Sequence, residues 1–242
     1  MTLYLIAAAV FGVAAFAQAV TGFGFSLVSV PLLAMADQPQ PAVVSATIIS
    51  LLLNAVTAWR ERAHAERPVA RRLLLAVAVG MPLGLLLLIS LPDLALLALI
   101  AVVNLASTVV VWRGWQLSPG AGTAAAAGIL AGVLTTTTGT NGPPLVATLR
   151  AMKLEPRVFR ATVALIFGVV GPVAVVGFGI AGTLTWHAVL LATAGLPATA
   201  LGAWLGNILF HRLNPAAFRR LVLSCLAASA LAALANATTR AI

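Results

Sequence analysis

Polar residues that could bind an anion occur in Thr135–Pro144, a stretch surrounded by apolar sequence. It contains five threonines, one asparagine, two glycines and two prolines. The glycines and prolines interrupt a helix, and a proline suits the first position of the next helix. Backbone N–H groups at a helix start lack intrahelical partners and carry partial positive charge. The stretch therefore predicts an anion site, to which Thr138, Thr140 and Asn141 could add hydroxyl and amide donors.

A second interruption, from Gln18 to Ser26, offers the same elements with fewer polar groups. Polar broken helices at repeat-related positions of a membrane protein are typical of substrate sites. The predicted substrate-binding residues are Gln18, Thr21, Gly22, Gly24, Ser26, Thr138, Gly139, Thr140, Asn141, Gly142 and Pro143. An alternative interpretation is a pair of tight loops whose threonine hydroxyls donate to backbone carbonyls.

The remaining reactive residue types indicate no metal site, no cofactor and no enzyme. Cys225 is the only cysteine, and the three histidines are widely scattered, so we expect no metal cluster. No Asp, Glu, Lys, Arg or His lies near the centre of an apolar span, which disfavours a buried carboxylate relay. An intramembrane enzyme would need a nucleophile and a base clustered in the membrane, where only Thr and Asn are available. Asn54 and Asn104 lie mid-span and are expected to be interhelical hydrogen-bond partners.

The elements that must position the two breaks are apolar helices. Hydrophobic residues make up 62% of the chain and charged residues 8%, and the mean hydropathy is +1.09. Soluble domains typically contain about 25% charged residues. Residues 73–91, 94–112 and 161–185 are almost free of charge, and each approaches the roughly 20 residues that cross a bilayer. The expected fold class is an all-α polytopic membrane protein.

The apolar segments follow the same order twice. The first series is 2–20, the short piece 25–36, then 42–59, 73–91 and 94–112; the second is 123–134, the short piece 143–149, then 161–182, 186–210 and 218–234. At an offset of 115 residues, Pro41 matches Pro156 and Gly24 matches Gly139. We therefore expect two repeats, 1–113 and 123–242, joined by a cytoplasmic linker at 114–122.

Clusters of basic residues predict how these segments cross the membrane. Thirteen of the 14 Lys and Arg residues lie in four clusters between apolar spans, and short cytoplasmic loops carry such an excess. The predicted cytoplasmic loops are 60–72, 113–122, 150–160 and 211–220, with both termini outside. Segment 42–59 then runs inward and 161–182 outward, so the repeats are inverted. Each repeat has a broken, re-entrant hairpin plus three transmembrane helices, or five crossings if both hairpin arms span the bilayer.

The same clusters also bear on binding partners. Arg160 would lie at the cytoplasmic mouth of its helix, where it either attracts anions or only anchors the topology. The net charge of +9 does not indicate nucleic-acid binding, because no aromatic platform is interleaved with the basic residues. Anionic lipid headgroups are the expected partner of the basic loops.

Several motifs occur in a fixed order along nearly the whole chain. They are Thr21-Gly22-Phe23-Gly24 followed by Val30-Pro31, then Trp59-Arg60, Gly139 through Pro144, Phe159-Arg160-Ala161-Thr162, and Gly202 with Gly206 before Phe218-Arg219. Through them the chain resembles the TauE/SafE family of sulfite and organosulfonate exporters, also called the sulfonate uptake permease family. The resemblance implies a bacterial inner-membrane protein that carries small sulfur-containing anions. Phe25-Ser26 depart from the glycine-rich pattern of the family.

The leading hypothesis is an alternating-access exporter of a small sulfur oxyanion, such as sulfite or a short organosulfonate. A passive anion channel and a membrane subunit of a larger transport complex are the alternatives. Unitary currents without saturation would favour the channel, and transport by the isolated protein would exclude the subunit. The sequence leaves the transport direction, coupling ion and oligomeric state open.

Overall fold

The computed structural model describes residues 1–21, 23–114, 120–140 and 142–210. Within these ranges the chain forms nine helices and no strand. They are α1 (Thr2–Thr21), α2 (Phe25–Ala36), α3 (Pro39–Glu61), α4 (Arg67–Ser90), α5 (Asp93–Arg113), α6 (Ala121–Thr138), α7 (Gly142–Ala151), α8 (Pro156–Ile180) and α9 (Trp186–Phe210). The expected all-α class is confirmed, and α1, α3, α4, α5, α8 and α9 are long and apolar enough to cross a membrane. The expected segment 218–234 lies outside the described residues.

The break in the second half is shorter than the sequence suggested. We expected it to begin at Thr135, but α6 continues through the four threonines to Thr138. The hydroxyls of Thr135 and Thr138 donate to backbone carbonyls four residues earlier, at 2.6 and 3.0 Å, which satisfies these polar groups inside an apolar bundle. The helix ends at Gly139, whose φ of 68° lies in the left-handed region. Only residues 139–141 separate α6 from α7.

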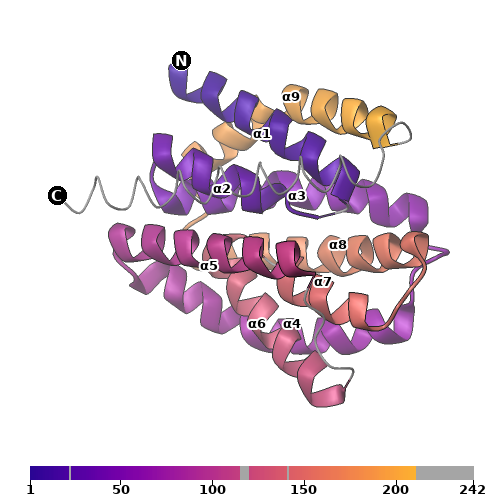
Figure 1. The fold of residues 1–242 in the computed structure, drawn as a ribbon. Coiled ribbons are helices and arrows are strands. Elements are labelled where there is room, and N and C mark those ends of the chain that lie inside the picture. The colour runs from indigo at the N-terminus through magenta and orange to yellow at the C-terminus, as the bar shows by residue number, and fades with distance from the viewer. Residues whose placement is uncertain (22, 115–119, 141, 211–242) are drawn as a thin grey trace.

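The helices pack in pairs on two sides of a central pair (Figure 1). Helix α1 packs along α9 on one side, α4 packs along α6 on the other, and α3 packs on α8 between them. Glycines bring the outer pairs into backbone contact. A Cβ atom on Gly202 of α9 would overlap the Gly12 carbonyl of α1, and one on Gly132 of α6 would overlap the Val77 carbonyl of α4. Small residues allow this close approach between membrane helices.

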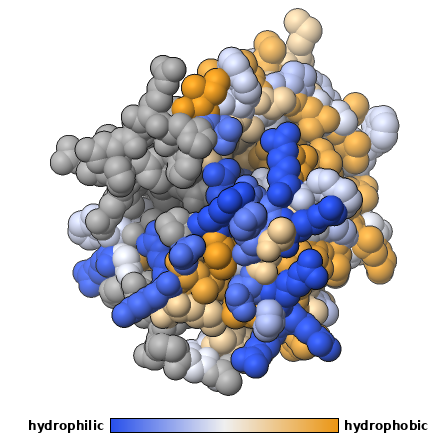
Figure 2. All heavy atoms as spheres, turned by 90° about the vertical axis from the view of Figure 1, so that its right-hand side faces the viewer, coloured by the Kyte–Doolittle hydropathy of each residue, from blue (hydrophilic) through white to orange (hydrophobic). Residues whose placement is uncertain are grey.

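Hydrophilic residues gather at the end of the bundle that faces the viewer in Figure 2. Arg157 Nε lies 3.1 Å from Glu61 Oε2, so the start of α8 meets the end of α3 there. The Glu66 N–H also donates to Thr162 Oγ1 at 2.9 Å. Exposed basic side chains at this end are Arg60, Arg62, Arg67, Arg71, Arg72, Arg150, Lys153 and Arg157. We refer to it as the basic end.

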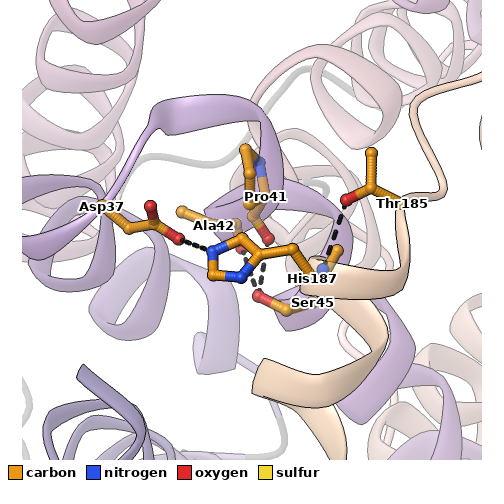
Figure 3. Close-up of polar contacts among 7 residues, drawn as sticks. Asp37, Pro41, Ala42, Ser45, Thr185 and His187 are labelled. Atoms are coloured by element: carbon orange, nitrogen blue, oxygen red, sulfur yellow. Dashed lines mark hydrogen bonds and ion pairs between the residues drawn. The ribbon is translucent and has the colours of Figure 1, made fainter. Parts of the chain in front are cut away.

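A side-chain hydrogen bond joins two connections at the opposite end. Asp37 lies between α2 and α3, and its Oδ2 is 2.7 Å from Nε2 of His187 in the first turn of α9 (Figure 3). Helix α3 therefore runs from the Asp37 end to the basic end. Helix α8 starts at the basic end and leads through residues 181–185 to α9, so α3 and α8 are antiparallel.

Candidate functional site

The two helix breaks lie against each other inside the bundle, although 115 residues separate them in sequence. A Cβ atom on Gly142 would lie 3.0 Å from Cδ2 of Phe23 in the first break. A Cβ atom on Gly139 would lie 3.3 Å from Val30 Cγ2 and 3.7 Å from Ser26 Cβ, both in α2. The loop that ends α6 thus packs directly on the loop and helix that follow α1.

A small pocket lies where the breaks meet, and we call it the break pocket. Its lining residues are Gln18, Phe23, Gly24, Phe25, Ser26, Leu27, Ser50, Asn54, Gly139, Thr140, Gly142 and Phe167. Six of the predicted binding residues, from both halves of the chain, therefore line one pocket. Its volume is about 10 Å³, which is room for about one water molecule. An oxyanion with three or four heavy atoms would require the pocket to widen.

Residues at the N-terminal ends of two short helices line the break pocket. Gly24, with φ 97°, is the N-cap of α2, and Gly142 is the first residue of α7. The first N–H groups of a helix have no partner within it, and the helix dipole adds partial positive charge at this end. In α7, Pro143 and Pro144 have no N–H, so among its first four residues only Gly142 and Leu145 carry one. Two such ends at one pocket form a suitable environment for an anion.

Other predicted residues lie beside the pocket or outside the described part of the chain. Thr138 and Pro143 are buried but do not line the pocket. The Thr140 hydroxyl donates to the Thr138 carbonyl at 3.3 Å, so the threonine hydroxyls here bond carbonyls, as the tight-loop interpretation expected. Gly22, Asn141 and the side chain of Thr21 lie outside the described residues.

Two polar residues of α3 line the pocket and are absent from the predicted set. Gln18 Nε2 donates to Asn54 Oδ1 at 3.0 Å, linking α1 to α3. Asn54 Nδ2 in turn lies 2.7 Å from the Ser50 carbonyl and 3.0 Å from Ser50 Oγ. Asn54 is thus an interhelical hydrogen-bond partner, as expected, but it also faces the pocket. The signal that could have identified Ser50 is its i, i+4 spacing to Asn54, which places both on one helix face.

A second, larger cavity adjoins the break pocket on the side of the basic end. It has a volume of about 520 Å³ and is bounded by α1, α3, α9 and the start of α8. Gln18 and Asn54 line both cavities. Arg160 lines the larger one together with Arg60, so Arg160 does not touch the break pocket itself.

Six apolar helices of spanning length, with interrupted helices that meet at an internal polar pocket, define a multi-pass membrane protein of the transporter class. The family model of the sulfite exporter TauE/SafE matches residues 6–233. The chain therefore belongs to this family of membrane transporters. No curated protein and no solved structure matches the chain.

Proposed function

We propose that the protein exports a small sulfur oxyanion, such as sulfite or a short organosulfonate, across the bacterial inner membrane by alternating access. The observation that carries this proposal is the convergence of the N-terminal ends of α2 and α7 on one pocket. Among the described residues that line it, none is charged, and Ser26, Ser50, Asn54 and Gln18 supply hydroxyl and amide groups. Neutral donors aimed at a buried anion stabilise it without a fixed counter-charge that would slow its release.

The proposed mechanism requires two inverted repeats, and the helix pairing supports them. At the offset of 115 residues, α1 corresponds to α6 and α4 corresponds to α9. In the α1–α9 contact the first half contributes α1 and the second half contributes α9. In the α4–α6 contact the second half contributes α6, the counterpart of α1, and the first half contributes α4, the counterpart of α9. The antiparallel central pair, α3 and α8, fits a two-fold axis between the repeats. Rocking of one repeat against the other around the break pocket would expose it to each side in turn.

We further propose that the basic end faces the cytoplasm and that the structure is an inward-facing state. The large cavity lies on the side of the basic end, while the Asp37–His187 pair bridges the two halves at the other end. The basic side chains would meet anionic lipid headgroups.

His187→Ala tests whether this bridge holds the outer side closed. A partly exposed hydrogen bond or ion pair contributes about 1 kcal/mol, so its loss should raise the outward-facing population by about fivefold. The readout is the rate at which an external, impermeant thiol reagent labels Ser45→Cys, which is buried beside the pair (Figure 3). Labelling of exposed Gln38→Cys is the control and should not change. An unchanged rate at Ser45→Cys would contradict a closing role for the bridge.

The proposed function is tested with purified protein in liposomes. We expect saturable sulfite or organosulfonate flux, and thermal stabilisation by the transported anion in a screen of sulfite, sulfate, thiosulfate, sulfoacetate and taurine. A ligand at 100 times its Kd should stabilise the protein by about 2.7 kcal/mol. Flux that does not saturate and shows unitary currents would identify a channel. The absence of both flux and stabilisation would reject the assignment.

A further inference from the structure

The larger cavity has the charge and the position of an anion entry route. Among the described residues that line it, the only charged side chains are Arg60 and Arg160, from the end of α3 and the start of α8. A planar guanidinium binds two oxygens of a sulfonate or sulfite at once. The described lining thus carries positive charge and no acidic side chain, which favours anions over cations and neutral solutes.

The interior of this cavity is polar as well. Thr57, Asn54 and Gln18 continue inward from the two arginines along α3 and α1. Thr199 of α9 also lines the cavity, although it is only 3% exposed. These side chains give the cavity wall hydroxyl and amide groups on the way to the break pocket.

Two residues joined by a hydrogen bond line both this cavity and the break pocket. Gln18 and Asn54 are 8% and 2% exposed, line both cavities, and join side chain to side chain at 3.0 Å. A single neutral hydrogen bond between membrane helices is weak. Gln18 Nε2 is the donor of this bond, and an oxyanion can accept its hydrogen in place of Asn54 Oδ1, while Asn54 Nδ2 stays bonded to Ser50. The pair can therefore separate around an anion without leaving an amide N–H group unbonded.

We propose that the 520 Å³ cavity is the entry vestibule of the transporter and that the Gln18–Asn54 pair is its inner gate. Arg60 and Arg160 collect the oxyanion, and the amide pair opens to admit it to the break pocket. This inference rests on the proposed function for the identity of the anion, but the gate itself is testable without transport.

The test measures thiol labelling from the cytoplasmic side of inside-out vesicles, in a Cys225→Ala background. The reagent is sulfonatoethyl methanethiosulfonate, which is anionic and impermeant. Ala203→Cys reports on the vestibule and Ser26→Cys on the break pocket behind the gate. We expect Ser26→Cys to react at least about tenfold more slowly than Ala203→Cys, since a tenfold change needs only about 1.4 kcal/mol of gate closure.

Opening the gate should raise only the inner rate. Adding Asn54→Ala or Gln18→Ala should raise the labelling rate of Ser26→Cys by about tenfold and leave the rate at Ala203→Cys unchanged. Asn104→Ala is the matched control, because Asn104 is also 2% exposed and mid-helix but lines neither cavity. Arg60→Gln with Arg160→Gln should slow the anionic reagent at Ala203→Cys and not a cationic one.

Three results would overturn the proposal. The first is that Ala203→Cys is not labelled. The second is that Asn54→Ala and Asn104→Ala change the labelling rate of Ser26→Cys equally. The third is that the labelling rates at both cysteines rise together, which would indicate loss of structure instead of a gate. The labelling test requires no substrate, so it is independent of the flux measurement. If the labelling rates change as expected but the protein shows no sulfite flux, the assignment of the anion is rejected and the gate is retained.

Discussion

Gly139→Leu should reduce sulfite transport to the level of empty liposomes. Gly139 has φ 68° and lines the break pocket, whose volume is only about 10 Å³. A leucine would fill this space and press on Val30 Cγ2, which a Cβ atom already approaches to 3.3 Å. The measurement is anion flux into proteoliposomes, normalised to the amount of folded protein.

Gly139→Ala separates backbone strain from pocket filling. Alanine shares the left-handed strain of about 1–2 kcal/mol but adds one methyl group, so it should lower thermal stability and keep part of the transport. Wild-type flux in folded Gly139→Leu protein would show that the break pocket is not on the anion path.

Gly132→Ala should cause a large loss of stability. Its Cβ atom would overlap the Val77 carbonyl oxygen, and it would lie 3.0 Å from Gly80 Cα, so α6 and α4 must move apart. Overpacking of this kind costs about 1–3 kcal/mol, and contact with the rigid backbone of α4 places this site at the upper end. Thermal unfolding in detergent measures the loss.

Gly122→Ala is the matched control for that variant. It lies in the same helix, and a Cβ atom there meets nothing within 4 Å. Alanine is favoured over glycine within a helix by about 0.5–1 kcal/mol, so this variant should be neutral or slightly more stable. Equal unfolding temperatures for the two variants would contradict the close α4–α6 packing.

The helices could be predicted where their ends carry strong local signals. Helices α2 and α9 match the expected ranges 25–36 and 186–210, because glycine, proline and aspartate bound the first and the Thr185–Trp186 step begins the second. The end of α6 was predicted too early. Threonine is a weak helix former in water, but hydroxyl bonds to carbonyls four residues earlier keep Thr135–Thr138 helical here.

The site could be predicted only in part. Interrupted helices are visible in the sequence, since glycine and proline mark them. The contribution of Ser50 and Asn54 depends on the packing of α3 against the breaks, and single polar residues in an apolar helix do not reveal their partners. The sequence gives even less indication of the larger cavity. Small residues of its wall leave the space open, and alanines are common throughout apolar helices; they include Ala15, Ala19, Ala200 and Ala203.

The most direct test of the account is a structure of the protein with selenite, the selenium analogue of sulfite, located by anomalous scattering. The account predicts one selenium peak within hydrogen-bonding reach of the N-terminal ends of α2 and α7, beside Ser26 and Gly139. A peak found only among the exposed arginines of the basic end, in protein that transports selenite, would contradict it.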